Sequence, residues 1–368
     1  MEHLTLGQIA QALDQARTPE AAAIASALAD HRIVGISGPA ESGKTTLLQR
    51  ALAPRQLDAE LAVVEIDLDG VSSLRHLTRR WLRGIARAVA GPVAFSHMVS
   101  LDREMWPGRT RTADHEAREI LRSEYDLALG AHTRGKPAAD ELDRALAATA
   151  RLARVRPTLI VIDHLEAPEL SGAFDVRALL WSVRAVTQRE KRMSVALACR
   201  PGAVSLAADE DGAFFGDGTW LTISPPRRET WRSATDAWER VDRICELTDG
   251  HVWSTASLIE RVSRREGLRV TGAFDALARE HAPLAARCVQ HAATLHRLGP
   301  TLMRGIANGL GPYQAAPDAQ SRDVAAAAQR LELAGLAYRP RRRVWRIVNP
   351  VVARALREPS PDFPAGPE

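Results

Sequence analysis

Residues 34–48 read VGISGPAESGKTTLL, and this stretch decides the fold. Gly38 to Thr45 match the pattern G-x-x-x-x-G-K-[ST], with an apolar segment before the match and a helix-forming segment after it. Glycines let such a loop curl, so that its backbone N–H groups point inward and form a nest for anions. The pattern therefore predicts a phosphate-binding loop between a buried strand and a helix, rather than an ordinary glycine-rich turn.

The residues of this loop predict a nucleoside triphosphate as the ligand. Lys44 is one of only three lysines in a chain whose other basic residues are arginine, so a lysine at this position is informative. In such a loop the lysine reaches the β- and γ-phosphates of ATP, and the next hydroxyl binds Mg²⁺. We therefore expect ATP and Mg²⁺ as cofactors, with Thr45 as a metal ligand. The expected nucleotide-binding residues are Gly38, Pro39, Ala40, Glu41, Ser42, Gly43, Lys44, Thr45 and Thr46.

A second polar site follows the apolar segment of TLIVIDHLE at 158–166. Asp163 is expected to hold Mg²⁺, because a phosphate-loop ATPase needs an acid at the end of a neighbouring strand; an ordinary strand-ending aspartate is the alternative. Hydrolysis also needs a group that polarises water. Glu166 is the preferred candidate, and a neutral His164 that orients water is the other. Slow or conditional hydrolysis is expected.

Apolar segments alternate with helical ones up to residue 225. Strands are predicted at 32–37, 61–68, 158–163, 194–199 and 220–223. Near-continuous apolar strands between helices indicate a parallel sheet that is covered on both faces. Arg200 follows the fourth strand, at the edge of such a sheet that faces a nucleotide. It is expected to read the γ-phosphate, unless it is one more surface residue of an arginine-rich chain.

The pattern changes after residue 225. Helices alone are predicted at 232–249, 252–266 and 271–281, and a hairpin at 337–348 (AYRPRRRVWRIV) follows further helices. In the first part, Thr18 is expected to cap a helix that has Pro19 in its first turn, and 113–129 and 138–155 are expected to be helices. The expected division is an N-terminal helical segment (1–30), a P-loop ATPase core (31–225), a helical lid (226–282), a winged helix-turn-helix (283–357) and a disordered tail (358–368).

GISGPAESGKTTLL, LIVIDHLE, ALACRPG and LTDGHVWSTASLIERV occur in this order before the C-terminal winged helix. In this the chain resembles STAND and AAA+ ATPases, including NACHT and NB-ARC proteins and archaeal origin-recognition ATPases. The resemblance implies a P-loop fold of the additional-strand type, with Arg200 as the sensor arginine and ATP controlling assembly into a homo-oligomer. Many such ATPases carry glutamate directly after the metal-binding aspartate. Here His164 takes that place.

The C-terminal part is strongly basic. Residues 284–357 hold twelve arginines and three acidic residues, a net charge of +9, whereas the whole chain carries +4. A local excess of this kind suggests an anionic partner. The candidate DNA-binding residues lie on or beside the hairpin, where they could follow phosphates: Arg339, Arg341, Arg342, Arg343 and Arg346. The alternative is a winged helix that packs on the ATPase core and does not bind DNA.

Two functions from different classes follow. The first is an ATPase that couples its nucleotide state to oligomerisation and DNA engagement; the second is a nucleotide-dependent scaffold or signalling switch with a protein partner. A small-molecule kinase is a weaker third reading, since no acceptor pocket is legible. No apolar run reaches the length of a membrane span. The three widely spaced cysteines and the polar N-terminal sequence favour a cytoplasmic protein without a signal peptide.

Overall fold

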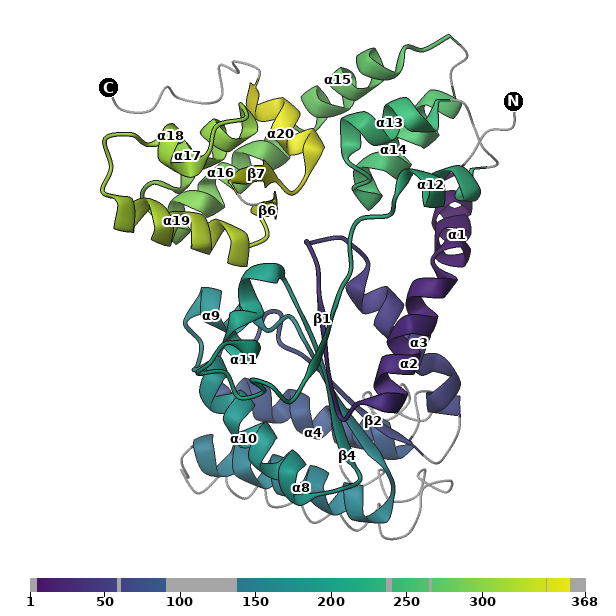
Figure 1. Ribbon diagram of the computed structural model, residues 1–368, viewed down its shortest axis with the longest axis vertical. Coiled ribbons are helices and arrows are strands. Elements are labelled where there is room, and N and C mark those ends of the chain that lie inside the picture. Colours follow the sequence, from purple (N-terminus) through teal and green to yellow (C-terminus); the bar gives the residue numbers. More distant parts are fainter. Residues whose placement is uncertain are drawn as a thin grey trace, which may run out of the picture.

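The computed structural model describes residues 5–57, 61–90, 138–235, 240–264, 267–341 and 343–357 (Figure 1). The predicted helix at 113–129, the expected tail at 358–368 and Arg342 lie outside the described residues. Within the described ranges, no helix has both the length and the apolar character needed to cross a membrane.

A five-stranded parallel sheet forms the centre of the larger lobe, in the order β2-β3-β4-β1-β5. The order places β4 between the strand that precedes the phosphate-binding loop and the strand that ends at Asp163, as expected for the additional-strand type. All five predicted strands are confirmed to within a residue or two. They are β1 (Ile33–Ser37), β2 (Ala62–Asp67), β3 (Thr158–Asp163), β4 (Met193–Cys199) and β5 (Thr219–Thr222).

Helices cover both faces of this sheet, as the apolar strands require. Two helices, α2 (Thr18–Asp30) and α3 (Lys44–Leu57), pack on one face through a core that includes Ile24, Leu48 and Val161. The other face carries a larger core built by helices before and after β3. These are α4 (Leu74–Ala90), α8 (Ala138–Val155), α10 (Val176–Arg189) and the short α11 (Ser205–Ala208), while α9 (Glu166–Ser171) and the 3₁₀ turn η2 (Pro201–Ala203) follow β3 and β4.

Two local predictions were wrong. Arg17, and not Thr18, is the N-cap of α2, because Thr18 already lies in the helix and its hydroxyl donates a hydrogen bond to the Gln15 carbonyl. The helix expected at 232–249 is two helices, α12 (Arg228–Ala234) and α13 (Val241–Thr248). The first ends because Thr235 leaves the helical conformation.

The helices after the sheet share one apolar core with the N-terminal helix. This core joins α1 (Leu6–Ala16) with what we call the middle helices and the C-terminal module. The middle helices are α12, α13, α14 (Val252–Ser263) and α15 (Val270–Glu280). The C-terminal module comprises α16 (Ala282–Leu295), α17 (Gly299–Ala307), α18 (Pro312–Ala315), α19 (Ser321–Leu333), the antiparallel strands β6 (Ala337–Arg341) and β7 (Val344–Ile347), and α20 (Pro350–Arg357).

The N-terminal segment therefore spans two packing units. Ile9 and Leu13 of α1 are buried with Trp231 of the middle helices, whereas α2 belongs to the core under the sheet. Figure 1 shows α1 and α2 running along one side of the molecule, from α12 down to α3. Together α1 and α2 form a strap, a name kept below for residues 6–30.

Candidate nucleotide-binding site

The phosphate-binding loop lies where β1 ends and α3 begins. The packing around its first glycine leaves no room for a side chain. A Cβ on Gly38 would lie 2.3 Å from the Ile223 carbonyl oxygen and 2.8 Å from Ser42 Oγ. Gly43 has φ +84°, a conformation that glycine adopts at little cost. Glu41 also has a positive φ of 59°, which is uncommon outside glycine and marks a tightly constrained loop.

Lys44 and Ser42 show that the loop fits a phosphate chain. The Lys44 ammonium donates to the Gly38 and Pro39 carbonyl oxygens at 2.8 Å each, so the side chain curls over the loop. Burial lowers the pKa of Lys44 against the opposing effect of the Glu166 and Asp163 carboxylates. Ser42 Oγ is buried and has no hydrogen-bond partner among the residues that the structure describes. A buried orphan hydroxyl beside a buried ammonium is a site that an anion would satisfy.

The expected Mg²⁺ ligands lie together. Thr45 Oγ1 donates to Asp163 Oδ2 at 2.6 Å, and the backbone N–H of His164 donates to Asp163 Oδ1 at 2.8 Å. Threonine hydroxyl and aspartate carboxylate are hard oxygen ligands, and Mg²⁺ is commonly held by one or two such groups plus phosphate oxygens and water. The residues present thus fit the metal as well as the nucleotide.

His164 is oriented by a residue that the sequence analysis missed. Its Nδ1 lies 2.9 Å from Asp67 Oδ1, and this hydrogen bond raises the pKa of the imidazole. His164 has φ +58°, which turns its side chain toward β2. Asp67 ends β2 directly beside Asp163, since the two residues pair in the parallel register. The sequence shows Asp67 at the end of a predicted strand, which marks it as a candidate site residue. It does not show that this strand pairs with β3.

Glu166 is engaged with Arg200. One Glu166 oxygen accepts from the Arg200 backbone N–H at 3.0 Å, and the other lies 3.1 Å from Arg200 Nε. The Glu166 side chain is only 2% exposed. A carboxylate held this way is poorly placed to accept a proton from water until the arginine moves. The structure thus brings both candidate bases to the same sheet edge but leaves only His164 partly exposed.

Arg200 also joins the sheet to the C-terminal module. Its Nη1 donates to the Leu333 carbonyl oxygen at the end of α19, at 2.8 Å. The Leu333 side chain is buried in the core of the sheet lobe. A Cβ on Gly335 would lie 2.8 Å from Arg200 Cζ and 3.1 Å from the Ala40 Cβ of the loop. The C-terminal module therefore rests directly on the phosphate-binding loop and on Arg200.

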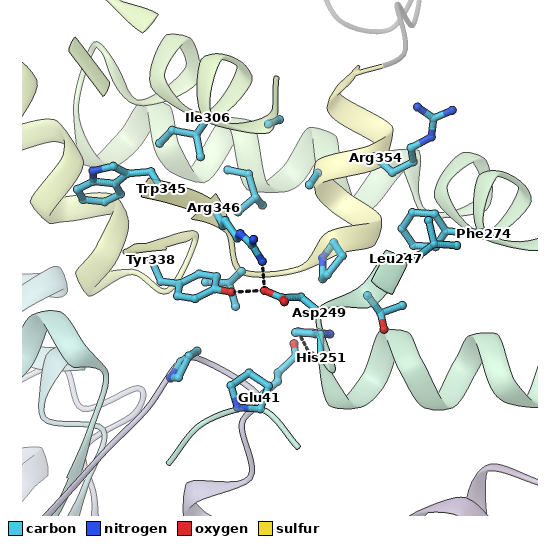
Figure 2. Close-up of a pocket in the computed structure, with 18 of the residues that line it drawn as sticks. Glu41, Leu247, Asp249, His251, Phe274, Ile306, Tyr338, Trp345, Arg346 and Arg354 are labelled. Atoms are coloured by element: carbon cyan, nitrogen blue, oxygen red, sulfur yellow. Dashed lines mark hydrogen bonds and ion pairs between the residues drawn. The ribbon is translucent and has the colours of Figure 1, made fainter. Parts of the chain in front are cut away.

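A cavity of about 610 Å³ opens beside this contact, bounded by the loop, α13, α15, the β6–β7 hairpin and α20. Figure 2 shows Tyr338 and Arg346 of the hairpin converging on Asp249, with Glu41 and His251 facing one another below. Tyr338 donates to Asp249 at 2.8 Å, and Arg346 pairs with the same oxygen. The buried His251 lies 3.2 Å from the Glu41 carboxylate, and this close contact lowers the pKa of Glu41.

The hairpin arginines divide into two groups. Arg346 is bound to Asp249, and Arg339 lies over the Trp345 ring at 5.9 Å, so both contribute to packing within the protein. Arg341 and Arg343 are exposed at the turn, where Arg343 has φ +68°. Arg342 lies outside the described residues. Arg339 and Arg346 remain exposed despite these contacts, so an outside partner can reach all four described arginines of the hairpin.

No family model matches the chain, and no curated protein matches it either. Among solved structures it is similar to the Walker-type ATPase PABY2304 of Pyrococcus abyssi, with a TM-score of 0.61 and 14% sequence identity over 93% of this chain and 95% of that chain. The Aeropyrum pernix Orc1 protein in complex with DNA has a TM-score of 0.42 at 14% identity over 92% of this chain and 91% of that chain. Cdc6p from Pyrobaculum aerophilum has a TM-score of 0.42 at 11% identity over 92% and 93%. The last two scores are too low to support an argument. The chain thus shares with the Pyrococcus abyssi protein an α/β fold in which a parallel five-stranded sheet carries the loop, and a helical lobe follows the sheet.

Proposed function

We propose that the protein binds Mg²⁺-ATP, hydrolyses it slowly, and uses the nucleotide state to dock or release its C-terminal module. The observation that carries this proposal is Arg200. One side chain binds the candidate base Glu166 and the Leu333 carbonyl oxygen of the docked module. A γ-phosphate beside Lys44 would compete for the same guanidinium, because arginine binds phosphate oxygens in preference to a neutral carbonyl.

The chain's own residues supply the remaining steps. Lys44 and the N–H groups of the loop bind the phosphates, and Thr45 and Asp163 would hold Mg²⁺, which would supply positive charge beside them. His164, fixed by Asp67, orients the attacking water, and the Glu166 oxygen that Arg200 Nε holds becomes available as a base when the guanidinium turns away. Because the guanidinium must leave both Glu166 and the Leu333 carbonyl oxygen before that carboxylate oxygen is free, hydrolysis is slow in the docked form.

The test is ATP turnover and ATP affinity of the purified protein, with Mg²⁺ and with EDTA. Lys44→Ala is expected to abolish binding, Glu166→Gln to lower kcat with little effect on affinity, and His164→Ala to lower kcat less. Tight ATP binding without turnover in every condition would support the nucleotide switch but refute the proposed ATP hydrolysis. Absence of binding in the wild-type protein would overturn the proposal.

In this switch, the released module and the sheet edge that it uncovers, where His164 and Glu166 lie, form the surface for assembly into a homo-oligomer or for a protein partner. The support is that Arg346–Asp249 holds the module against the middle helices and Arg200–Leu333 holds it against the sheet lobe in the docked form. Size measured in solution with ADP and with a non-hydrolysable ATP analogue tests this step. The expected result is a larger species with the analogue, and an unchanged size with both nucleotides argues against it.

DNA engagement by a winged helix-turn-helix is the second candidate function, supported by the exposed tip arginines. The double variant Arg341→Ala/Arg343→Ala is expected to weaken duplex binding and to flatten its dependence on salt by about 0.9 in log–log slope per lost phosphate contact. Arg79→Ala/Arg83→Ala removes the same charge from the exposed side of α4 and serves as the control. Equal losses in both variants would mean that binding follows net charge alone.

A further inference from the structure

Arg17 is a buried arginine that neither the loop motif nor the proposed chemistry uses. It stands between α1 and α2, and only 4% of its surface is exposed. Burying a guanidinium is costly unless its charge is paired and its N–H groups are bonded. Glu20 meets the charge: its carboxylate accepts from Arg17 Nε at 2.7 Å and also from Nη2. The remaining donors are therefore free to hold neutral groups.

Those donors hold the phosphate-binding loop from behind. Arg17 Nη1 donates to the Ser42 carbonyl oxygen at 2.6 Å, and Nη2 lies 3.4 Å from the Ser224 carbonyl oxygen, in the segment that leads from β5 to the middle helices. A Cβ on Gly43 would lie only 2.9 Å from Arg17 Nη1. The guanidinium thus fills the outer side of the loop just before Lys44.

This contact fixes which way the peptide groups of the loop point. A nest for phosphate needs successive N–H groups to face inward, so the carbonyl groups must face outward and find donors there. The Ser42 carbonyl is buried and has Arg17 as its donor. Because Glu20 neutralises the charge of the Arg17 guanidinium, Arg17 favours phosphate binding by orienting the loop and not by attracting the phosphate.

We infer that Arg17 is a positioning residue that sets the loop for nucleotide and couples it to the strap and to the middle helices. The inference rests on the proposed binding of ATP. The coupling follows from what Arg17 joins: α1 packs with the middle helices, α2 packs with the sheet, and Ser224 begins the connection between them. A movement of the middle helices is thereby transmitted to the loop.

The experiment measures ATP affinity by calorimetry, with thermal unfolding without nucleotide as the check on folding. Arg17→Ala and Arg17→Lys are both expected to weaken affinity by about tenfold to a hundredfold, the effect of losing one buried charge-assisted hydrogen bond. Lysine keeps the charge but cannot reach Ser42, Ser224 and Glu20 together, so it distinguishes geometry from charge. Ethylguanidinium in solution is expected to restore affinity to Arg17→Ala and to leave Lys44→Ala unchanged.

Arg50→Ala is the matched control. Arg50 of α3 binds Asp14 and Thr18, which lie close to Arg17 where α1 meets α2. These contacts do not involve the loop. Its removal is expected to lower the unfolding temperature without changing ATP affinity. Wild-type affinity in Arg17→Lys, or equal losses in Arg17→Lys and Arg50→Ala, overturns the inference. If Arg17→Ala fails to fold, Glu20→Gln, which releases the guanidinium from its anchor, is expected to weaken affinity severalfold. Failure of the wild-type protein to bind ATP is a different result and refutes the proposed function instead.

Discussion

Replacing Gly335 by alanine tests whether docking of the C-terminal module restrains hydrolysis. Gly335 has φ +67° and lies just after α19, and an added Cβ would meet the Arg200 guanidinium at 2.8 Å and the Ala40 side chain at 3.1 Å. Contacts this short cannot be accommodated in place. Either the Arg200 guanidinium must shift, which weakens its contacts with Leu333 and Glu166, or the module must move away from the loop.

Two terms contribute to the magnitude. A left-handed alanine costs about 1–2 kcal/mol, and the displaced hydrogen bonds of Arg200, which involve a charged group, cost about 1.5–3 kcal/mol each. Gly309 isolates the first term, because it has φ +84° in the same module and no atom of the described residues meets its added Cβ within 4 Å. The difference between Gly335→Ala and Gly309→Ala therefore reports the docking contact alone. A difference of about 1.4 kcal/mol already changes the docked-to-released ratio tenfold.

The assay is steady-state ATP turnover, paired with urea unfolding of both variants. Both are expected to lose stability, but only Gly335→Ala is expected to turn over ATP faster than the wild-type protein, because Glu166 is released with Arg200. Equal turnover in Gly335→Ala and Gly309→Ala would refute the idea that the docked module restrains the site. Slower turnover in Gly335→Ala alone would mean that the docked Arg200 assists the chemistry.

Three further predictions concern single contacts. Asp67→Asn is expected to lower kcat about tenfold or more with little change in KM, since His164 loses the carboxylate that orients it; an unchanged kcat would exclude His164 from the reaction. Gly35→Ala is expected to destabilise the fold by about 1–3 kcal/mol in urea unfolding, because its Cβ would lie 2.2 Å from the Trp220 ring. Gly7→Ala is the control, since its added Cβ meets no described atom within 4 Å. The contact with His251 holds the pKa of Glu41 below its ordinary value of 4.5. The stability that Glu41 adds is therefore complete above about pH 4.5 and is lost as the pH falls through the lowered pKa. The difference in unfolding midpoint between the wild-type protein and Glu41→Gln is therefore expected to shrink in acid, and a constant difference would count against the Glu41–His251 contact.

The phosphate-binding loop and the sheet were open to prediction because their signals are local. A run such as TLIVID is apolar at every position but the last, so it specifies a buried strand and its polar end in one segment. The G-x-x-x-x-G-K-T pattern likewise specifies backbone geometry within a few residues. The prediction of one helix at 232–249 was wrong because periodicity alone does not show where a helix is interrupted.

The partners within the site were not open to prediction, because they depend on which strands and lobes become neighbours. Asp67 orients His164 only because β2 pairs with β3, and Arg17 reaches Ser42 only because the strap crosses behind the loop. Arg346, a candidate DNA contact, also binds Asp249, and Glu166 is bound by Arg200. Each of these pairs is separated by at least tens of residues along the chain, and nothing in either residue's local sequence names the other.

The sequence by itself determined the anion nest, its lysine, the apolar strands and the acid at the end of β3, since each arises from backbone and side-chain preferences over a short segment. Only the tertiary structure decided that the C-terminal module rests on the loop, that Arg200 serves both the sheet and that module, and that a buried arginine before α2 supports the loop from outside. The physical reason is burial. A charged group can remain in the interior only where folding brings it a partner, and that partner is chosen by the packing of whole elements.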